Sequence, residues 1–210
     1  MFLELLKAND RDAIVAEARR NPGIVVATWE RGWATTWDGR GWKPSSDDHG
    51  FGRVRYATWV RAFRAAGYCE GVGHGTDWVC HEIKPATPPD EPILLYRAAP
   101  VVRRLGMSWT SDYDEAVNFS NYNGAGKRQC VNIYAHWAFP EELLAYIYKW
   151  NKRWEWPYGI ATADEYVLDP KFLDDDNVEP VSVPMGNYSD TYLSYVTPDR
   201  PATFGLLTPP

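Results

Sequence analysis

The sequence predicts an α+β protein in which helices come first and short strands follow. Three observations indicate this class. Apolar residues recur at helical spacing early in the chain, a proline-rich stretch at 85–89 interrupts it, and short alternating or β-branched runs follow. With 210 residues, 45% of them hydrophobic, the chain can bury a core without disulfides. We expect a helical, Trp-rich accessory segment at 1–90 and a strand-rich domain at 91–210.

The first elements are predicted from spacing and turn residues. Apolar residues at helical spacing predict helix over 3–18, with Asn9 or Asp10 as a second start. The Asn-Pro-Gly sequence at 21–23 should end this helix. A β-branched run follows at 24–29 and predicts a short strand.

The rest of the N-terminal segment contains one more predicted helix. Residues 31–52 combine glycines with tryptophans and predict an irregular aromatic loop. Residues 56–66 place apolar side chains on one helical face, and Gly67 is suited to end that helix. Residues 69–81 are predicted to be irregular. The stiff stretch at 85–89 is the best boundary in the chain.

The second half begins with two strands and a helix. Residues 93–97 and 106–110 are predicted strands, and a helix should run over 112–119. Ser111 and Asp114 have the spacing of a capping box, in which each side chain bonds to the other residue's backbone amide.

The remaining elements alternate between strand and helix. Residues 130–137 alternate apolar and polar side chains, as in a half-buried strand. Residues 139–144 should start a helix, because a proline occupies its first turn and two acids lie near its positive end. Strands are predicted at 165–169 and 178–183.

Charge and cysteine content exclude several classes of protein. The net charge is −6, and no long basic stripe is present, which argues against tight non-specific binding to duplex nucleic acid. No apolar run is long enough to span a membrane. Three cysteines are an odd number, so we expect a reducing, cytoplasmic setting. The 11 tryptophans exceed what a core needs, so some should line a binding surface.

Three short motifs in the second half occur in a recognisable order. They are LYR at 95–97, GMSWT at 106–110 and DEYVL at 164–168. Together they resemble the arginine–serine–glutamate signature of ADP-ribosyltransferases, and they are most similar to short bacterial and phage members of that family. The resemblance extends over about 91–184. It implies a split β sandwich with a cleft that holds NAD, preceded here by the helical accessory segment.

The resemblance implies a role for each residue of the triplet. Cleavage of the nicotinamide–ribose bond passes through a cation-like sugar, which Glu165 would stabilise. Arg97 would hold the pyrophosphate or the adjoining ribose with its charged fork. Ser108 would orient Glu165 or the ribose, and Thr110 would support the same corner. Tyr122 is a candidate to stack on nicotinamide. Trp109 alternates with Ser108 and Thr110, so it should point into the core.

The acceptor of ADP-ribose is the least determined part of this prediction. Ala163 stands where arginine-modifying relatives carry a Glu or Gln, so arginine lacks its usual partner. Residues 149–158 occupy the family's target-recognition loop and interleave cations with aromatics. The recognition candidates within this loop are Arg153, Trp154 and Trp156. This pattern suits base stacking with phosphate contacts, a protein partner, or simple packing against the N-terminal segment. Protein is the default acceptor, and nucleic acid is the main rival.

Two other functions and one rival site remain open at this point. An NAD glycohydrolase shares the first chemical step and uses water as the acceptor. A non-catalytic interaction protein could use the same scaffold. Cys69, His74, Cys80 and His81 could ligate zinc, but their spacing matches no common zinc motif, and we expect no metal.

Overall fold

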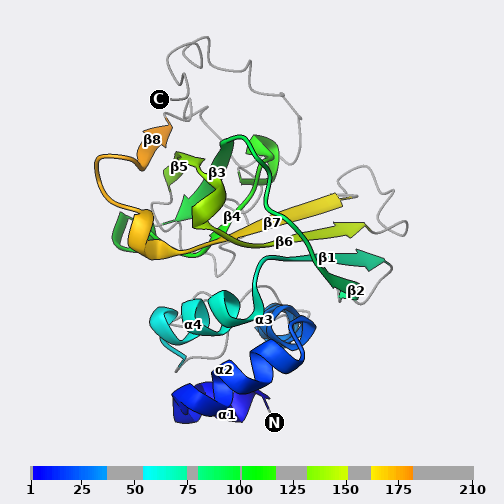
Figure 1. The fold of residues 1–210 in the computed structure, drawn as a ribbon. Helices are drawn as coiled ribbons and strands as arrows, with labels where there is room; N and C mark the ends of the chain where they lie inside the picture. Colours follow the sequence, from blue (N-terminus) through cyan, green and yellow to red (C-terminus); the bar gives the residue numbers. More distant parts are fainter. Residues whose placement is uncertain are drawn as a thin grey trace.

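The structure is a computed structural model that describes residues 2–36, 54–74, 80–99, 101–116, 132–150 and 162–181. Four helices come first and two β-sheets follow (Figure 1). The helices are α1 (Phe2–Ala8), α2 (Arg11–Arg20), α3 (Gly23–Thr36) and α4 (Tyr56–Ala66). The strands are β1 (Cys69–His74), β2 (Cys80–Pro85), β3 (Ile93–Ala99), β4 (Ser108–Trp109), β5 (Asn132–Ala138), β6 (Leu143–Trp150), β7 (Thr162–Leu168) and β8 (Glu179–Val181). Short 3₁₀ helices are η1 (Val101–Arg103), η2 (Pro140–Glu142) and η4 (Pro170–Phe172).

The elements form three layers. A five-stranded sheet has the order β2-β1-β6-β7-β4, and a three-stranded sheet has the order β3-β5-β8. Strands β1 and β6 run parallel, and the other described pairs are antiparallel. The helices cover one side of the larger sheet, and the smaller sheet lies on its other side (Figure 1). The predicted α+β class is therefore confirmed.

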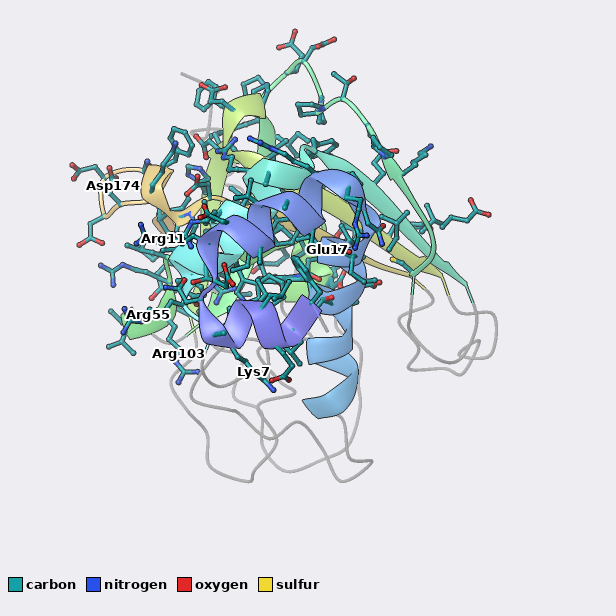
Figure 2. All side chains as sticks on the ribbon, turned by 60° about the horizontal axis from the view of Figure 1, so that its bottom comes forward. Lys7, Arg11, Glu17, Arg55, Arg103 and Asp174 are labelled. Carbon is teal, nitrogen blue, oxygen red and sulfur yellow. The ribbon has the colours of Figure 1, made fainter. Side chains whose placement is uncertain are left out.

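Two hydrophobic cores join the layers. The helical core packs Val26, Trp29 and Phe63 against Ile147 of β6. The core between the two sheets includes the side chain of Trp109, which points inward as predicted. Figure 2 looks onto the helices and shows Lys7, Arg11 and Glu17 on the outer surface of this layer. The helices are thus amphipathic, with their apolar faces toward the sheet.

Several predicted boundaries are confirmed. The Asp10 side chain accepts a hydrogen bond from the Ala13 amide at 3.1 Å and caps α2. Asn21 ends that helix, as predicted. The helix predicted at 56–66 is α4, and Gly67 follows it with a positive φ of 78°. Strands β3, β4, β5, β7 and β8 lie within or overlap their predicted ranges.

The strand predicted at 24–29 is wrong, because these residues belong to α3. Val25, Val26 and Trp29 are fully buried and fall on one helical face. Burial of that face against the sheet therefore outweighs the strand preference of the β-branched run. Helix α3 also includes residues 31–36 of the predicted loop, and residues 37–53 lie outside the described part of the chain.

Two other predictions fail at the larger sheet. Residues 69–81 are not irregular, since β1 and β2 pair there as antiparallel strands. Gly71 is required in β1, because a Cβ atom would lie 2.8 Å from Cys80 Sγ and 3.2 Å from Val26. The helix predicted at 139–144 is only the 3₁₀ turn η2, after which β6 begins at Leu143.

The proline-rich stretch at 85–89 does not divide the chain into a helical part and a part that holds all the strands. Strands β1 and β2 precede it, yet they belong to the five-stranded sheet that also contains β6 and β7. The helical core likewise includes side chains from β6 and β7. The segment before residue 91 therefore supplies two strands and one packed face of the same sheet.

Candidate functional site

Arg97 lies at the junction of the two sheets. It alternates with Leu95 and Ala99 on β3 and so faces the core between the sheets, where it is only 8% exposed. Its Nη1 donates to the Ser108 carbonyl oxygen at 2.6 Å, and its Nε donates to the Arg103 carbonyl oxygen at 3.3 Å. Because backbone atoms hold two edges of the guanidinium, its orientation is fixed by the fold.

Ser108 and Glu165 lie on the same face of the larger sheet. In the β4–β7 pair Ser108 is opposite Val167, and Glu165 is two residues from Val167 along β7. Side chains two residues apart share a face, so Ser108 and Glu165 are diagonal neighbours. Val167 and Ile147, which is opposite Glu165, belong to the helical core. This face is therefore the one that the helices cover.

Trp29 provides a direct hydrogen bond to Glu165. Its indole Nε1 donates to Glu165 Oε1 at 2.9 Å, across the space between α3 and β7. The Trp29 ring meets Trp59 and Phe63 of α4 edge-on, with ring centroids 5.0 Å and 5.5 Å apart. Sequence reasoning missed Trp29 because it placed this residue at the end of a strand. The spacing of Val25, Val26 and Trp29 was the available signal for a helical face.

Thr110 lies at the crossing point of the two sheets. Its backbone pairs with Tyr96 of β3, and its hydroxyl lies within hydrogen-bonding distance of the carboxylates of Glu115 and Asp164. Glu115 Oε2 also accepts from the Asp164 amide at 3.1 Å. Burial, with a smaller effect from the Asp164 charge, raises the pKa of Glu115 to about 8. Thr110 therefore organises a buried acidic corner beside the triplet.

The capping box predicted for Ser111 and Asp114 is wrong. Asp112 accepts instead from the amides of Asp114 and Glu115, at 2.8 Å and 3.3 Å. The Ser111 amide and hydroxyl both donate to Asp164. Ser111 is thus drawn toward β7 and is unavailable as a cap, so Asp112 takes that place.

The opposite face of the larger sheet carries tyrosines. Tyr146 and Tyr166 stack with ring centroids 4.6 Å apart, and Tyr68 lies in the same group. Burial raises the pKa of all three hydroxyls. These side chains are half-buried, and Glu70 adds to the upward shift of each pKa. This face differs from the helix-covered face in being rich in polar atoms.

Four predicted site residues lie outside the described part of the chain. Tyr122, a candidate for stacking on nicotinamide, is one of them. The other three are the recognition candidates Arg153, Trp154 and Trp156. Strand β6 ends at Trp150 and β7 starts at Thr162, so the three recognition candidates lie between these strands in the sequence.

The described side chains do not gather into a metal site. Cys69 and Cys80 are both buried, but in the β1–β2 register Cys69 is opposite Pro85, whereas Cys80 is opposite Gly73. Among the described side chains, no three His, Cys, Asp or Glu residues come together as a metal site. The side chains of His74 and His81 lie outside the description.

His136 has a structural environment. Its Nε2 is 2.6 Å from Glu142 Oε2, and its Nδ1 is 2.9 Å from the Asn177 carbonyl oxygen. Both side chains of the His136–Glu142 pair are buried. The pair therefore ties β5 to η2 and to the turn before β8.

Comparisons with protein-family models, with curated proteins and with solved structures find no match to this chain. Within the described ranges, none of the helices combines the length and apolar character needed to cross a membrane.

Proposed function

We propose that this chain is an NAD-dependent mono-ADP-ribosyltransferase with the split β sandwich of that family, acting in a cytoplasm as a phage or bacterial effector or toxin. The observation that carries the proposal is the proximity of three distant motifs, with Arg97 reaching the Ser108 backbone from the core between the sheets and Ser108 and Glu165 on the helix-covered face. Arg97 donates to the backbone of Ser108, and Ser108 is the diagonal neighbour of Glu165 on the paired strand. These are the three positions that the resemblance to the arginine–serine–glutamate class assigns to the reaction.

The residue types suit cleavage of the bond between nicotinamide and ribose. When this bond breaks, its electron pair leaves with nicotinamide and positive charge develops on the sugar. The Glu165 carboxylate stabilises that charge and accepts a hydrogen bond from the neighbouring ribose hydroxyl. Arg97 is always charged and is oriented by two carbonyls, so it is suited to hold the pyrophosphate. Ser108 orients the ribose or the carboxylate.

The second half of the reaction attaches ADP-ribose to an acceptor. A nucleophile attacks the anomeric carbon and loses its proton, which completes the transfer. Ala163 supplies no side chain to orient a guanidinium in the place where arginine-modifying relatives have one. We favour a protein acceptor docked on the 149–158 loop, with nucleic acid as the main rival. Water as the acceptor would make the chain an NAD glycohydrolase.

The test is incubation of the purified chain with NAD labelled in its ADP-ribose part and with cell lysate, followed by separate protease and nuclease treatment. Label that protease releases supports a protein acceptor, and label that nuclease releases supports nucleic acid. NAD consumption without labelled macromolecules indicates the glycohydrolase. Unconsumed NAD contradicts both enzyme functions and leaves the interaction protein.

The role of the loop is tested with a Trp154→Ala, Trp156→Ala double variant. If the loop recognises the acceptor, labelling should fall while NAD hydrolysis persists. Equal loss of both activities, with a lower melting temperature, would show that these indoles are packed in the core instead.

A further inference from the structure

The helical layer contributes a polar contact to the proposed site. Trp29 has no exposed surface, and its Nε1 donates to Glu165 Oε1 at 2.9 Å. A buried indole N–H needs an acceptor, and here that acceptor is a carboxylate on a different layer of the fold. Val25 and Val26 of α3 pack with Ile147 of the sheet in one apolar core. Two polar contacts from α3 cross this interface, namely the Trp29–Glu165 bond and a bond from the Cys80 amide of β2 to Glu30 Oε2 at 2.9 Å.

Aromatic packing determines where the indole points. Trp59 and Phe63 of α4 meet the Trp29 ring edge-on, at interplanar angles of 87° and 77°. Edge-on packing on two sides leaves the ring little freedom to tilt. Because the indole is held in place, its N–H defines the position of one carboxylate oxygen, Glu165 Oε1.

We infer that Trp29 is a positioning residue for Glu165. Helix α3 supplies this donor and helix α4 holds its ring in place, so both helices contribute to the site. The inference rests on the proposed function, because it assigns Glu165 to the chemistry. An N–H donor favours the charged form of a carboxylate and lowers its pKa. Trp29 would thus fix the orientation of the Glu165 carboxylate and favour its charged form.

The first test examines the contact without NAD. In ¹⁵N-labelled protein, the indole signal that disappears in Trp29→Phe is assigned to Trp29. If the bond exists in solution, this signal shifts as pH falls through the pKa of Glu165, and the shift is lost in Glu165→Gln. An indole signal that is independent of pH, or that titrates equally in Glu165→Gln, overturns the inference.

The second test measures NAD cleavage by the same variants. Trp29→Phe keeps an aromatic ring in the cluster but removes the donor. We expect kcat to fall on the order of tenfold, with the KM for NAD changing less than kcat. The acid limb of the pH–kcat profile should move to higher pH, because the carboxylate loses a donor that favours its charged form.

Phe63→Leu is the matched control. It removes a ring that packs on Trp29 but leaves the indole N–H in place, so it should lower the melting temperature without moving the acid limb. If Trp29→Phe behaves like Phe63→Leu, with reduced stability and an unchanged pH profile, Trp29 is a core residue only and the inference is wrong. If the wild-type protein leaves NAD unconsumed while the Trp29 signal titrates, the proposed function fails and the catalytic role of Trp29 fails with it, although the contact stands.

Discussion

Asp164 and Glu165 are adjacent carboxylates on β7, but they lie in opposite environments. Glu165 faces the helices and accepts from the indole of Trp29 beside a hydrophobic core. Asp164 faces the other way and accepts from Thr110 and Ser111. Strand alternation sends neighbouring side chains to opposite faces, so adjacency in sequence implies no shared role. Glu165 is therefore a carboxylate with a positioned indole donor, whereas Asp164 connects β7 to Thr110 and Ser111.

The difference has an electrostatic consequence. On the helix side Glu165 accepts from the Trp29 indole beside a hydrophobic core, where the low local dielectric strengthens such a bond. On the other side Asp164, Glu115 and Glu70 lie near several hydroxyl groups. The Asp164 carboxylate there divides its hydrogen bonds among several donors. We therefore assign the chemistry to Glu165 and structural roles to Asp164 and Glu115, while Arg97 reaches the Ser108 backbone from the core between the sheets.

The largest expected difference between the two carboxylates should appear when each is replaced by its amide. Glu165→Gln should keep the fold and NAD affinity but lower turnover by a factor on the order of 10²–10³, as expected for one preorganised electrostatic group. Asp164→Asn should instead lower the free energy of unfolding, because its charge-assisted bonds to Thr110 and Ser111 weaken. Nicotinamide release and thermal melting measure the two effects. A larger loss of turnover in Asp164→Asn, at unchanged stability, would reverse the assignment.

Glu115, which lies next to Asp164, should make the free energy of unfolding depend on pH. Its folded pKa is about 8, above the ordinary value for a glutamate, because burial disfavours the charged form. The unfolded chain loses this proton first, so the stabilisation is complete below about pH 4.5 and is lost as pH rises toward 8, at roughly 1 kcal/mol per pH unit. Urea unfolding of wild type and Glu115→Gln at several pH values measures it. Parallel pH curves for the two proteins would contradict this effect.

Substitutions at Gly71 and Val72 compare how tightly the two faces of β1 are packed. Gly71→Ala places a Cβ atom 2.8 Å from Cys80 Sγ on the helix side, so we expect a loss of about 1–3 kcal/mol in stability. Val72 is half-buried on the opposite face, and Val72→Thr should change stability by only about 0.5 kcal/mol. Chemical denaturation compares them. Equal losses would mean that the helix-covered face is no more tightly packed than the other.

The smallest expected effect concerns the tyrosines on the Asp164 side. Burial raises the pKa of Tyr68, Tyr146 and Tyr166, so these hydroxyls stay neutral in the folded protein when ordinary tyrosines ionise. Their contribution to stability is present below about pH 10 and is lost as pH rises further. Tyr146→Phe should leave melting at neutral pH nearly unchanged and reduce the alkaline loss. Absorbance at alkaline pH should show one late-titrating tyrosine fewer in the variant.

The sequence predicted the local elements of this fold better than their packing. The helix at 56–66 was predictable because its apolar residues share one face and a glycine follows it. Residues 24–29 were not, because the preference of Ile24, Val25 and Val26 for strands is weaker than the burial of one helical face. Burial depends on the sheet, which forms from residues far along the chain.

The candidate site was predictable only where its residues lie in local motifs. Arg97, Ser108 and Glu165 lie in short motifs whose order indicates a family, so they could be named from sequence. Trp29 lies far from those motifs, and only the packing of α3 on β7 brings its indole to Glu165. The pairing of Thr110 with Glu115 and Asp164 depends on the crossing of two sheets. No local pattern encodes such contacts.

The parallel pairing of β1 with β6 has a practical consequence for how the chain can be divided. In the intact protein, β1 lies between β2 and β6 and satisfies the backbone groups along one side of β6. A fragment that begins after the proline-rich stretch would leave β6 as an open edge, with a row of unpaired amides and carbonyls over Ala145–Trp150. Such edges recruit strands from other molecules. Expression of residues 91–210 alone should therefore give aggregates, whereas fragments that retain β1 and β2 keep this edge covered.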